Sequence, residues 1–182
     1  MGYEYDLIND FAKSQGLKLN IKVAENPARL IEMLEAGEVD VVAYPIPINN
    51  KLKQEVIYCG REDISSQVLI QRANKGDKLL TDVTQLIDKN VYVKPNTKYS
   101  ERLKNLDEEL GGGIHIQKVE NDSIATEDLI EMVSLGEIPY TISDDNTARL
   151  NKTYYWNINV DLKVSFPQRS SWVVRKSSPD LA

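Results

Sequence analysis

The residues best suited to binding chemistry follow the ends of predicted strands. The apolar run Val39–Ala43 is typical of a strand buried on both faces. In open α/β sheets, ligands bind beyond the carboxyl ends of the strands. We therefore expect the proline-stiffened turn after this run to offer aromatic surface and backbone groups to a small ligand; it comprises Tyr44, Pro45, Ile46 and Pro47. Packing beneath the sheet is the alternative for Tyr44.

Two further candidates lie on or after predicted strands. Asp144 follows the strand predicted at Pro139–Ser143 and begins a short helix. Its place at a strand end favours a role in ligand binding, whereas Asp before a helix is also an ordinary N-cap. Gln67 lies on the strand predicted at Ser65–Arg72, where its side chain can hydrogen-bond a ligand or pair across a hinge. The sequence leaves both alternatives open for each residue.

Asn96 and Thr97 open a predicted helix whose apolar face includes Leu103 and Leu106. The free N–H groups and the positive dipole end of a helix N-terminus suit a carboxylate or another anion. Helix capping is the alternative for each residue. An anion-binding turn is therefore one of two roles that the sequence predicts here.

The residue types that catalytic and metal sites require are scarce. His115 is the only histidine and Cys59 the only cysteine, so neither a zinc site nor a Cys–His nucleophile is expected. No G-x-S-x-G, P-loop or G-x-G-x-x-G pattern occurs, and the run Gly111–Gly113 indicates a helix end. We predict no catalytic residue, no metal and no cofactor in this chain.

The composition restricts the partners. The chain has 182 residues, of which 41% are hydrophobic, and this suits one ordinary domain or two small lobes. Its formal charge of −6 is spread along the sequence, so nucleic acid, which needs a clustered basic face, is not an expected partner. No apolar run approaches the roughly 18 residues of a membrane span. The sequence starts within a helix-entry motif, and we expect an upstream segment to precede it.

Alternating elements surround the candidate residues. A helix over 5–15, a strand over 17–23, a helix over 27–36 and the strand at 39–43 predict a parallel sheet with crossover connections. Further alternating elements fill 73–153, and Val160–Val174 is predicted to return as a strand to the first lobe. The expected domains are therefore lobe 1, residues 1–72 plus 154–182, and lobe 2, residues 73–153. A ligand cleft is expected between them, with hinges near Gln67 and Asp161.

These elements and two motifs resemble the type 2 periplasmic substrate-binding proteins, in the extracellular solute-binding family 3. Gly2–Ala12 resembles the family's opening pattern of glycine, an aromatic residue and Asp-Leu, and Gly37–Val42 resembles its G-x-x-D strand entry. The resemblance implies an α/β, two-lobed fold in which each lobe is a mostly parallel sheet flanked by helices. It also implies that the family's first strand, before Gly2, and its last helix, after Asp180, are missing from lobe 1.

Three segments are similar to the binding modules of membrane-bound lytic transglycosylases of the F type: Ile48–Lys53, Ser66–Arg72 and Tyr140–Thr147. This similarity implies a location in the periplasm or cell envelope and a catalytic domain tethered outside this chain. Such transglycosylases carry their catalytic acid in a Glu-Ser pair, which this sequence lacks. The chain alone is therefore expected to be a non-catalytic, regulatory binding module.

The resemblance also assigns roles to the candidate residues. It implies that Asp144 binds a ligand ammonium group and that the turn at Asn96 and Thr97 binds the ligand's acid group. Amino-acid receptors of the family have Ser or Thr at the place of Pro47 and Arg at the place of Leu52, which together clamp the α-carboxylate. Both are absent here. We therefore expect cell-wall peptides or amino-acid-like solutes as ligands, and weak binding of single free amino acids.

Two other functions stay open on the same fold. A solute receptor of an ABC transporter would deliver amino-acid-like compounds to a membrane permease. A dehydratase-like enzyme would need a general acid in its cleft, for which Glu4, Glu62 or Asp144 are available without a supporting spacing. The parent sequence beyond Ala182 would separate a tethered catalytic domain from a free-standing receptor.

Overall fold

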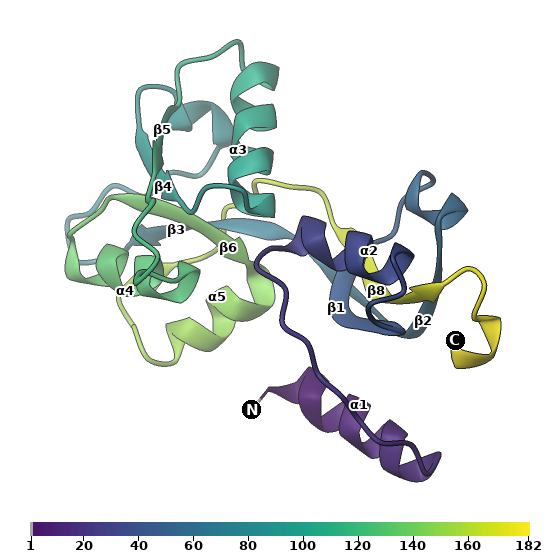
Figure 1. Cartoon of the computed structure of the whole chain (residues 1–182). Helices are drawn as coiled ribbons and strands as arrows, with labels where there is room; N and C mark the ends of the chain where they lie inside the picture. Colours follow the sequence, from purple (N-terminus) through teal and green to yellow (C-terminus); the bar gives the residue numbers. More distant parts are fainter. Residues whose placement is uncertain (1) are drawn as a thin grey trace. The chain divides into compact units, whose positions relative to one another are not determined.

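The computed structural model describes residues 2–182, which divide into two units (Figure 1). The first unit comprises the chain up to Ile64 together with Gln168–Ala182, and the second comprises Ser65–Pro167. Each unit contains its own sheet, of three strands in the first and five in the second. No helix in the described part of the chain is long and apolar enough to cross a membrane.

In the first unit, α2 (Pro27–Glu35) packs against a sheet in which β8 (Gln168–Arg175) lies between β1 (Val41–Pro47) and β2 (Val56–Ser65). A 3₁₀ turn at Leu52–Gln54 joins β1 to β2. The strands β1 and β8 are antiparallel. The core between the sheet and α2 is small and aliphatic, and it consists of Leu34, Val42, Ile46, Val56 and Val173.

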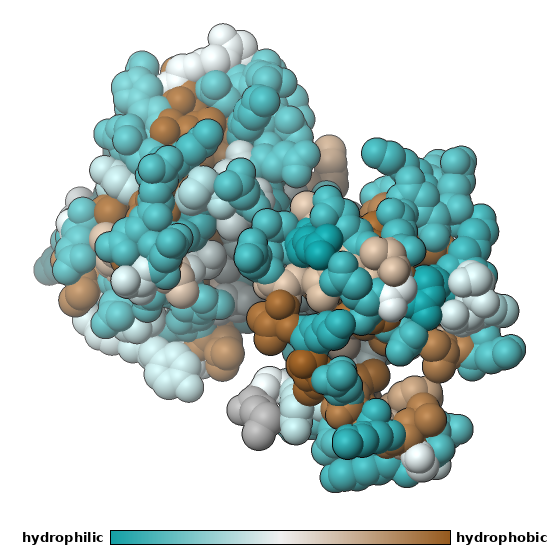
Figure 2. Space-filling model, viewed as in Figure 1, coloured by the Kyte–Doolittle hydropathy of each residue, from teal (hydrophilic) through white to brown (hydrophobic). Residues whose placement is uncertain are grey.

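The segment after α1 (Tyr3–Ser14) differs from the sequence-based expectation. Residues 17–23, predicted as a strand, form none, and Leu17, Ile21 and Val23 are 53%, 51% and 90% exposed. An alternating segment becomes a strand only when a neighbouring strand takes up its backbone N–H and C=O groups. No described strand of this sheet does so. The predicted series of parallel crossovers is therefore wrong for this unit, and Figure 2 shows apolar surface over this part of it.

The second unit is built on a five-stranded sheet of order β5-β4-β6-β3-β7. Its strands are β3 (Gln67–Arg72), β4 (Asn90–Val93), β5 (His115–Lys118), β6 (Tyr140–Asp144) and β7 (Ile158–Asn159). The strand β4 is parallel to β5 and β6, whereas β3 is antiparallel to β6 and β7. The expectation of a mostly parallel sheet is thus corrected to a mixed sheet in the second unit.

The connections explain this mixture of strand directions. Crossover helices join β4 to β5 and β5 to β6, and such connections place neighbouring strands in parallel. A loop with only a 3₁₀ turn at Val83–Leu86 joins β3 to β4. That loop requires no common direction, so β3 is free to run opposite to the strand beside it.

Helices cover both faces of the second sheet. One face packs against α3 (Lys98–Glu109), and the other packs against α4 (Thr126–Leu135) and α5 (Asp145–Lys152) (Figure 1). Side chains of β3 alternate between two apolar clusters because successive residues of a strand point to opposite faces. Leu69 joins the α3 cluster, and Val68 and Ile70 join the α4 cluster.

The later part of the chain contributes to both sheets. The strand predicted at Val160–Val174 forms only over its later part, as β8 in the first unit's sheet, and the two-residue strand β7 just before it pairs with β3 in the second unit. Between them, Lys163 bridges to Val68. The second unit therefore extends beyond residues 73–153 at both ends, because β3 and β7 are strands of its sheet.

Candidate functional site

Asp144 ends β6 and occupies the N-cap position of α5, yet its side chain makes no capping hydrogen bond. Its Oδ2 atom instead accepts hydrogen bonds from Lys98 Nζ at 2.6 Å and from the Tyr99 hydroxyl at 3.2 Å. The Lys98 ammonium also lies 5.4 Å from the centre of the Tyr99 ring, within range of a cation–π interaction. The Asp144 carboxylate is thus directed at a cation beside the start of α3.

Gln67 stands directly opposite Asp144 in the antiparallel β3–β6 pair. Directly opposed residues point to the same face with neighbouring Cβ atoms, so the fold brings these two predicted site residues together. Gln67 is only 4% exposed, and its Oε1 atom has no hydrogen-bond partner among the described residues. A buried polar atom without a partner is costly, so this oxygen is an unused hydrogen-bond acceptor on the strand beside Asp144.

The turn before α3, predicted either to bind an anion or to cap the helix, contains a helix cap. Thr97 is the N-cap, and it forms a reciprocal capping box with Ser100: the Ser100 N–H donates to Thr97 Oγ1 at 3.2 Å and the Thr97 N–H donates to Ser100 Oγ at 3.1 Å. Asn96 is exposed and has a left-handed φ of 57°, a conformation that Asn tolerates. Capping therefore accounts for Thr97, while the side chain of Asn96 faces solvent.

Lys98, the first residue of α3, is the partner of Asp144 that sequence analysis missed. The two residues lie 46 positions apart, and only the packing of α3 beside the end of β6 brings them together. No local pattern indicates such a pair. Tyr99, whose spacing with Leu103 indicates a core residue, both packs against the core and donates to Asp144.

Asp145, the neighbour of Asp144, is bound into the second unit. Its N–H donates to the Ser66 carbonyl oxygen at 2.9 Å, and its Oδ2 lies 3.7 Å from Arg149 Nη1 along α5. Its Oδ1 is buried without a hydrogen-bond partner in the described part of the chain. Asp145 is the first residue of α5, where its negative charge interacts favourably with the positive end of the helix dipole.

The predicted turn at Tyr44–Pro47 belongs to β1, which corrects the expectation of a loop. Ile46 is 3% exposed and packs in the core, so only its backbone is available to a ligand. Tyr44 is 39% exposed, Pro45 is half-buried and Pro47 is exposed. The Pro47 carbonyl oxygen already accepts a hydrogen bond from the Tyr58 hydroxyl at 2.6 Å. This segment therefore exposes the Tyr44 side chain, and it presents few polar groups that could bind a ligand.

A hollow of about 240 Å³ lies beside this strand in the first unit, and Lys53, Tyr58, Glu62 and Arg169 line part of it. Arg169 and Glu62 form an ion pair across it. Cys59 also lines the hollow, and burial raises the pKa of its thiol. A raised pKa leaves less thiolate at neutral pH, so Cys59 is not set up as a nucleophile.

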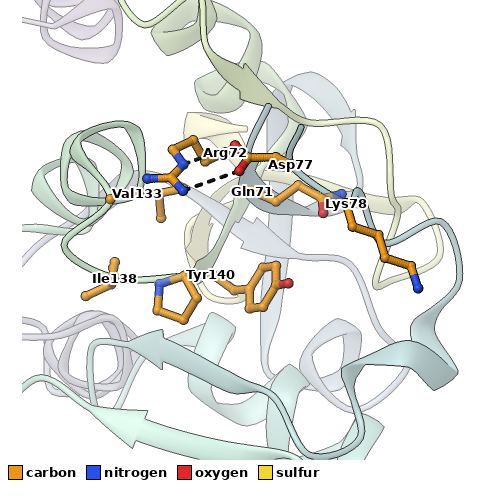
Figure 3. Close-up of a pocket in the computed structure, with 9 residues that line it drawn as sticks. Gln71, Arg72, Asp77, Lys78, Val133, Ile138 and Tyr140 are labelled. Carbon is orange, nitrogen blue, oxygen red and sulfur yellow. Dashed lines mark hydrogen bonds and ion pairs between the residues drawn. The ribbon is translucent and has the colours of Figure 1, made fainter. Parts of the chain in front are cut away.

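A second hollow, of about 350 Å³, lies at the other end of β3 and β6 in the second unit. Figure 3 shows the Arg72–Asp77 ion pair and Tyr140 on opposite sides of it, with Lys78 pointing away from the pair. Burial raises the pKa of Tyr140, and the negative charge of Asp77 adds to the effect. None of the residues predicted to bind a ligand lines either hollow.

The described residues contain no group of three or more His, Cys, Asp or Glu side chains that could hold a metal ion. His115 lies exposed at the start of β5. The electrostatic feature at the strand ends is instead the Lys98–Asp144 pair. Its side chains are 40% and 21% exposed, so water and small solutes reach it.

Comparison with known proteins defines the class. The family model of the bacterial extracellular solute-binding proteins, family 3, matches residues 1–182, so the chain belongs to this family. The structure superimposes on the P235GK mutant of ArgBP from T. maritima with a TM-score of 0.76 at 22% identity, covering 100% of this chain and 74% of that chain. A truncated, arginine-bound form of ArgBP gives a TM-score of 0.75 and 80% coverage of that chain. The predicted fold class, a type 2 periplasmic-binding-protein fold, is confirmed.

The similarity to curated sequence relatives is more specific. A membrane-bound lytic murein transglycosylase F of Desulfosudis oleivorans is 31% identical over 100% of this chain and 38% of the relative. A protein of the same name from Pseudomonas fluorescens is 27% identical over 95% of this chain and 35% of the relative. The chain thus spans little more than a third of the length of these relatives. The predicted likeness to the F-type transglycosylases is confirmed.

Proposed function

We propose that this chain is a non-catalytic ligand-binding module of a cell-envelope protein, facing the periplasm, that binds a cell-wall peptide or an amino-acid-like solute. The family of the chain and its transglycosylase-like relatives support this proposal. The ligand would present an ammonium group to Asp144. Its other groups would be bound without the Ser/Thr–Arg clamp, since Pro47 and Leu52 stand at those positions.

The observation that carries the proposal is that the Asp144 carboxylate pairs with an ammonium group instead of capping α5. An aspartate whose only task is to begin a helix accepts hydrogen bonds from the first N–H groups of that helix. Asp144 makes none of these bonds and instead binds a cation. The unpartnered Gln67 Oε1 beside it adds a second acceptor of the kind that an ammonium group, with its three donors, can use.

A regulatory role follows from the same proposal. The relatives are transglycosylases, and this chain would correspond to the part that senses wall fragments while a tethered domain cuts glycan. A ligand can bias a tethered partner only by binding one conformation better than another. Ligand binding here would therefore shift the population of conformations that the partner domain meets.

A receptor for a transporter is the second candidate, favoured by one similar structure, a substrate-binding protein of an amino acid ABC transporter, at 22% identity and a TM-score of 0.71. The two candidate functions predict different ligands. A receptor of that kind should bind at least one single amino acid at micromolar concentration, whereas the wall-peptide module should bind short peptides and no single amino acid at that level.

The Asp144→Asn variant tests the site by calorimetry with the dipeptide alanyl-glutamate, which has one ammonium and two carboxylate groups. Leaving a ligand cation without its carboxylate partner should lower the affinity at least about tenfold. Stability should change little, because Asp144 does not cap α5. Asp122→Asn, an exposed aspartate of the same unit, is the matched control. Equal affinities in wild type and Asp144→Asn would remove Asp144 from the site.

A further inference from the structure

Lys98 occupies Asp144 with the same chemical group that the proposed ligand would bring. Its ε-ammonium lies 2.6 Å from Oδ2, which is the distance of a charge-assisted hydrogen bond. A ligand ammonium and the Lys98 ammonium therefore compete for one carboxylate. In the structure the site is filled by the protein's own side chain.

The Lys98–Asp144 ion pair is weak enough for a ligand ammonium group to displace Lys98. The Lys98 side chain is 40% exposed, and a partly exposed ion pair contributes little to stability because water screens it and the long side chain loses freedom in it. Lys98 is the first residue of α3, where its N–H needs no intrahelical partner, and the cap of this helix is formed by Thr97 and Ser100. Its ammonium group can therefore release the Asp144 carboxylate and remain close to it without disturbing α3.

We propose that Lys98 is the specificity-determining residue of this site: it selects ligands that carry a carboxylate as well as an ammonium group and disfavours plain amines. This inference rests on the proposed role of Asp144 in ligand binding. A ligand with both charges exchanges partners with the pair, its ammonium taking Asp144 and its carboxylate taking Lys98. A plain amine leaves two ammonium groups beside one carboxylate, and their repulsion lowers its affinity.

The other groups around the pair leave this charge balance in place. The Tyr99 hydroxyl donates to Asp144 and is neutral, and Gln67 Oε1 is a neutral acceptor that favours an ammonium from either source. Asp145 is paired with Arg149 along α5. Lys98 and Asp144 are therefore the charges that decide between a dipolar ligand and a plain cation.

The test compares two matched peptides by calorimetry: alanyl-glutamate, and alanyl-glutamine amide, which keeps the ammonium and loses both carboxylates. Lys98→Met keeps most of the apolar stem and removes the charge. We expect the amide to bind about threefold more tightly to this variant and alanyl-glutamate about threefold more weakly, so that the preference falls about tenfold. Lys104→Met, an exposed lysine of α3 with no ion pair to a described residue, should leave the preference unchanged.

The outcomes separate the two proposals. A preference that stays the same in Lys98→Met, with the affinity still lowered at least about tenfold by Asp144→Asn, overturns the role of Lys98 and keeps the ligand site. Binding of neither peptide by the wild-type chain, or binding that Asp144→Asn leaves unchanged, overturns the proposed site and this inference with it. Thermal unfolding of each variant shows that the comparison is made on folded protein.

Discussion

The two units cover their sheets to different degrees. In the second unit, helices pack on both faces, and side chains such as Leu69, Leu129 and Leu103 are fully buried in two clusters. In the first unit one small cluster lies between α2 and the sheet. The helix α1 buries only Ala12, while Leu7 and Phe11 remain about 40% exposed.

This difference in coverage indicates which contacts stabilise each unit. Burial of apolar side chains contributes roughly 25 cal/mol for each Å² removed from water. A sheet that is covered on both faces therefore gains more stabilisation per strand than a sheet covered on one. We infer that the second unit is held mainly by its own core, whereas α1 contributes little to the stability of the first.

The largest expected effect compares one leucine from each unit. Leu129→Ala removes a fully buried side chain of α4 and should lower the free energy of unfolding of the second unit by about 2–5 kcal/mol. Leu7→Ala removes a side chain that is 40% exposed, and it should cost less than about 1 kcal/mol. Amide hydrogen exchange reports the two units separately. Equal losses in the two variants would contradict the difference in coverage.

A pair of helix-ending glycines gives a smaller effect. Gly37, after α2, and Gly136, after α4, have φ values of 74° and 78°, which a residue with a Cβ adopts at a cost of about 1 kcal/mol. A Cβ at Gly37 meets no atom, whereas a Cβ at Gly136 collides with Nη1 of Arg72. Gly136→Ala should therefore cost up to about 1 kcal/mol more than Gly37→Ala, because Arg72 must leave Asp77.

A double variant checks this explanation by denaturant unfolding. If the excess cost of Gly136→Ala comes from the displaced guanidinium, it should vanish when Arg72 has already been replaced by Ala. An excess that persists in the Arg72→Ala background would mean that the backbone around Gly136 resists the change for another reason.

The same contrast explains which parts of the fold could be predicted. In the second unit the predicted elements depend on local signals, such as the apolar spacing of Leu103 and Leu106. The helix predicted to open at Asn96 and Thr97 begins at Lys98, and the strand predicted at Pro139–Ser143 is β6, Tyr140–Asp144. In the first unit, residues 17–23 alternate like a strand but find no partner. Pairing is a property of two segments, so one segment cannot predict it.

The residues of the candidate site also differ in how far the sequence could predict them. Asp144 and Gln67 could be identified one at a time from their places on strands, and the register that puts them side by side comes from the sheet. Lys98 could not be predicted, because it reaches Asp144 only where α3 packs beside the end of β6, and the two residues are 46 positions apart. The capping role of Thr97 was one of two local alternatives, and only its geometry with Ser100 identifies it.

The smallest expected effect concerns acid. In the second unit Arg72 is held by a carboxylate, because its Nε and Nη2 atoms donate to Asp77 at 3.1 and 3.3 Å. In the first unit, Arg175 donates to the backbone carbonyl oxygens of Leu34 and Val39 as well as to Asp40. Backbone carbonyl groups do not titrate. Acid should therefore loosen the Arg72 contact before it loosens the Arg175 contact.

The direction follows from the pKa of Asp77. Its hydrogen bonds with Arg72 and with the Asn74 N–H hold this pKa below the ordinary value of 3.8. A lowered folded-state pKa means that the contribution to stability is complete above 3.8 and is lost as the pH falls through the folded-state value. Hydrogen exchange of the Asn74 amide, followed from neutral pH down to acid, should show protection that declines over this range in the wild type. In Asp77→Asn the amide oxygen does not titrate, so protection should be lower at neutral pH and nearly independent of pH, and a decline as steep as that of the wild type would show that another group senses the acid.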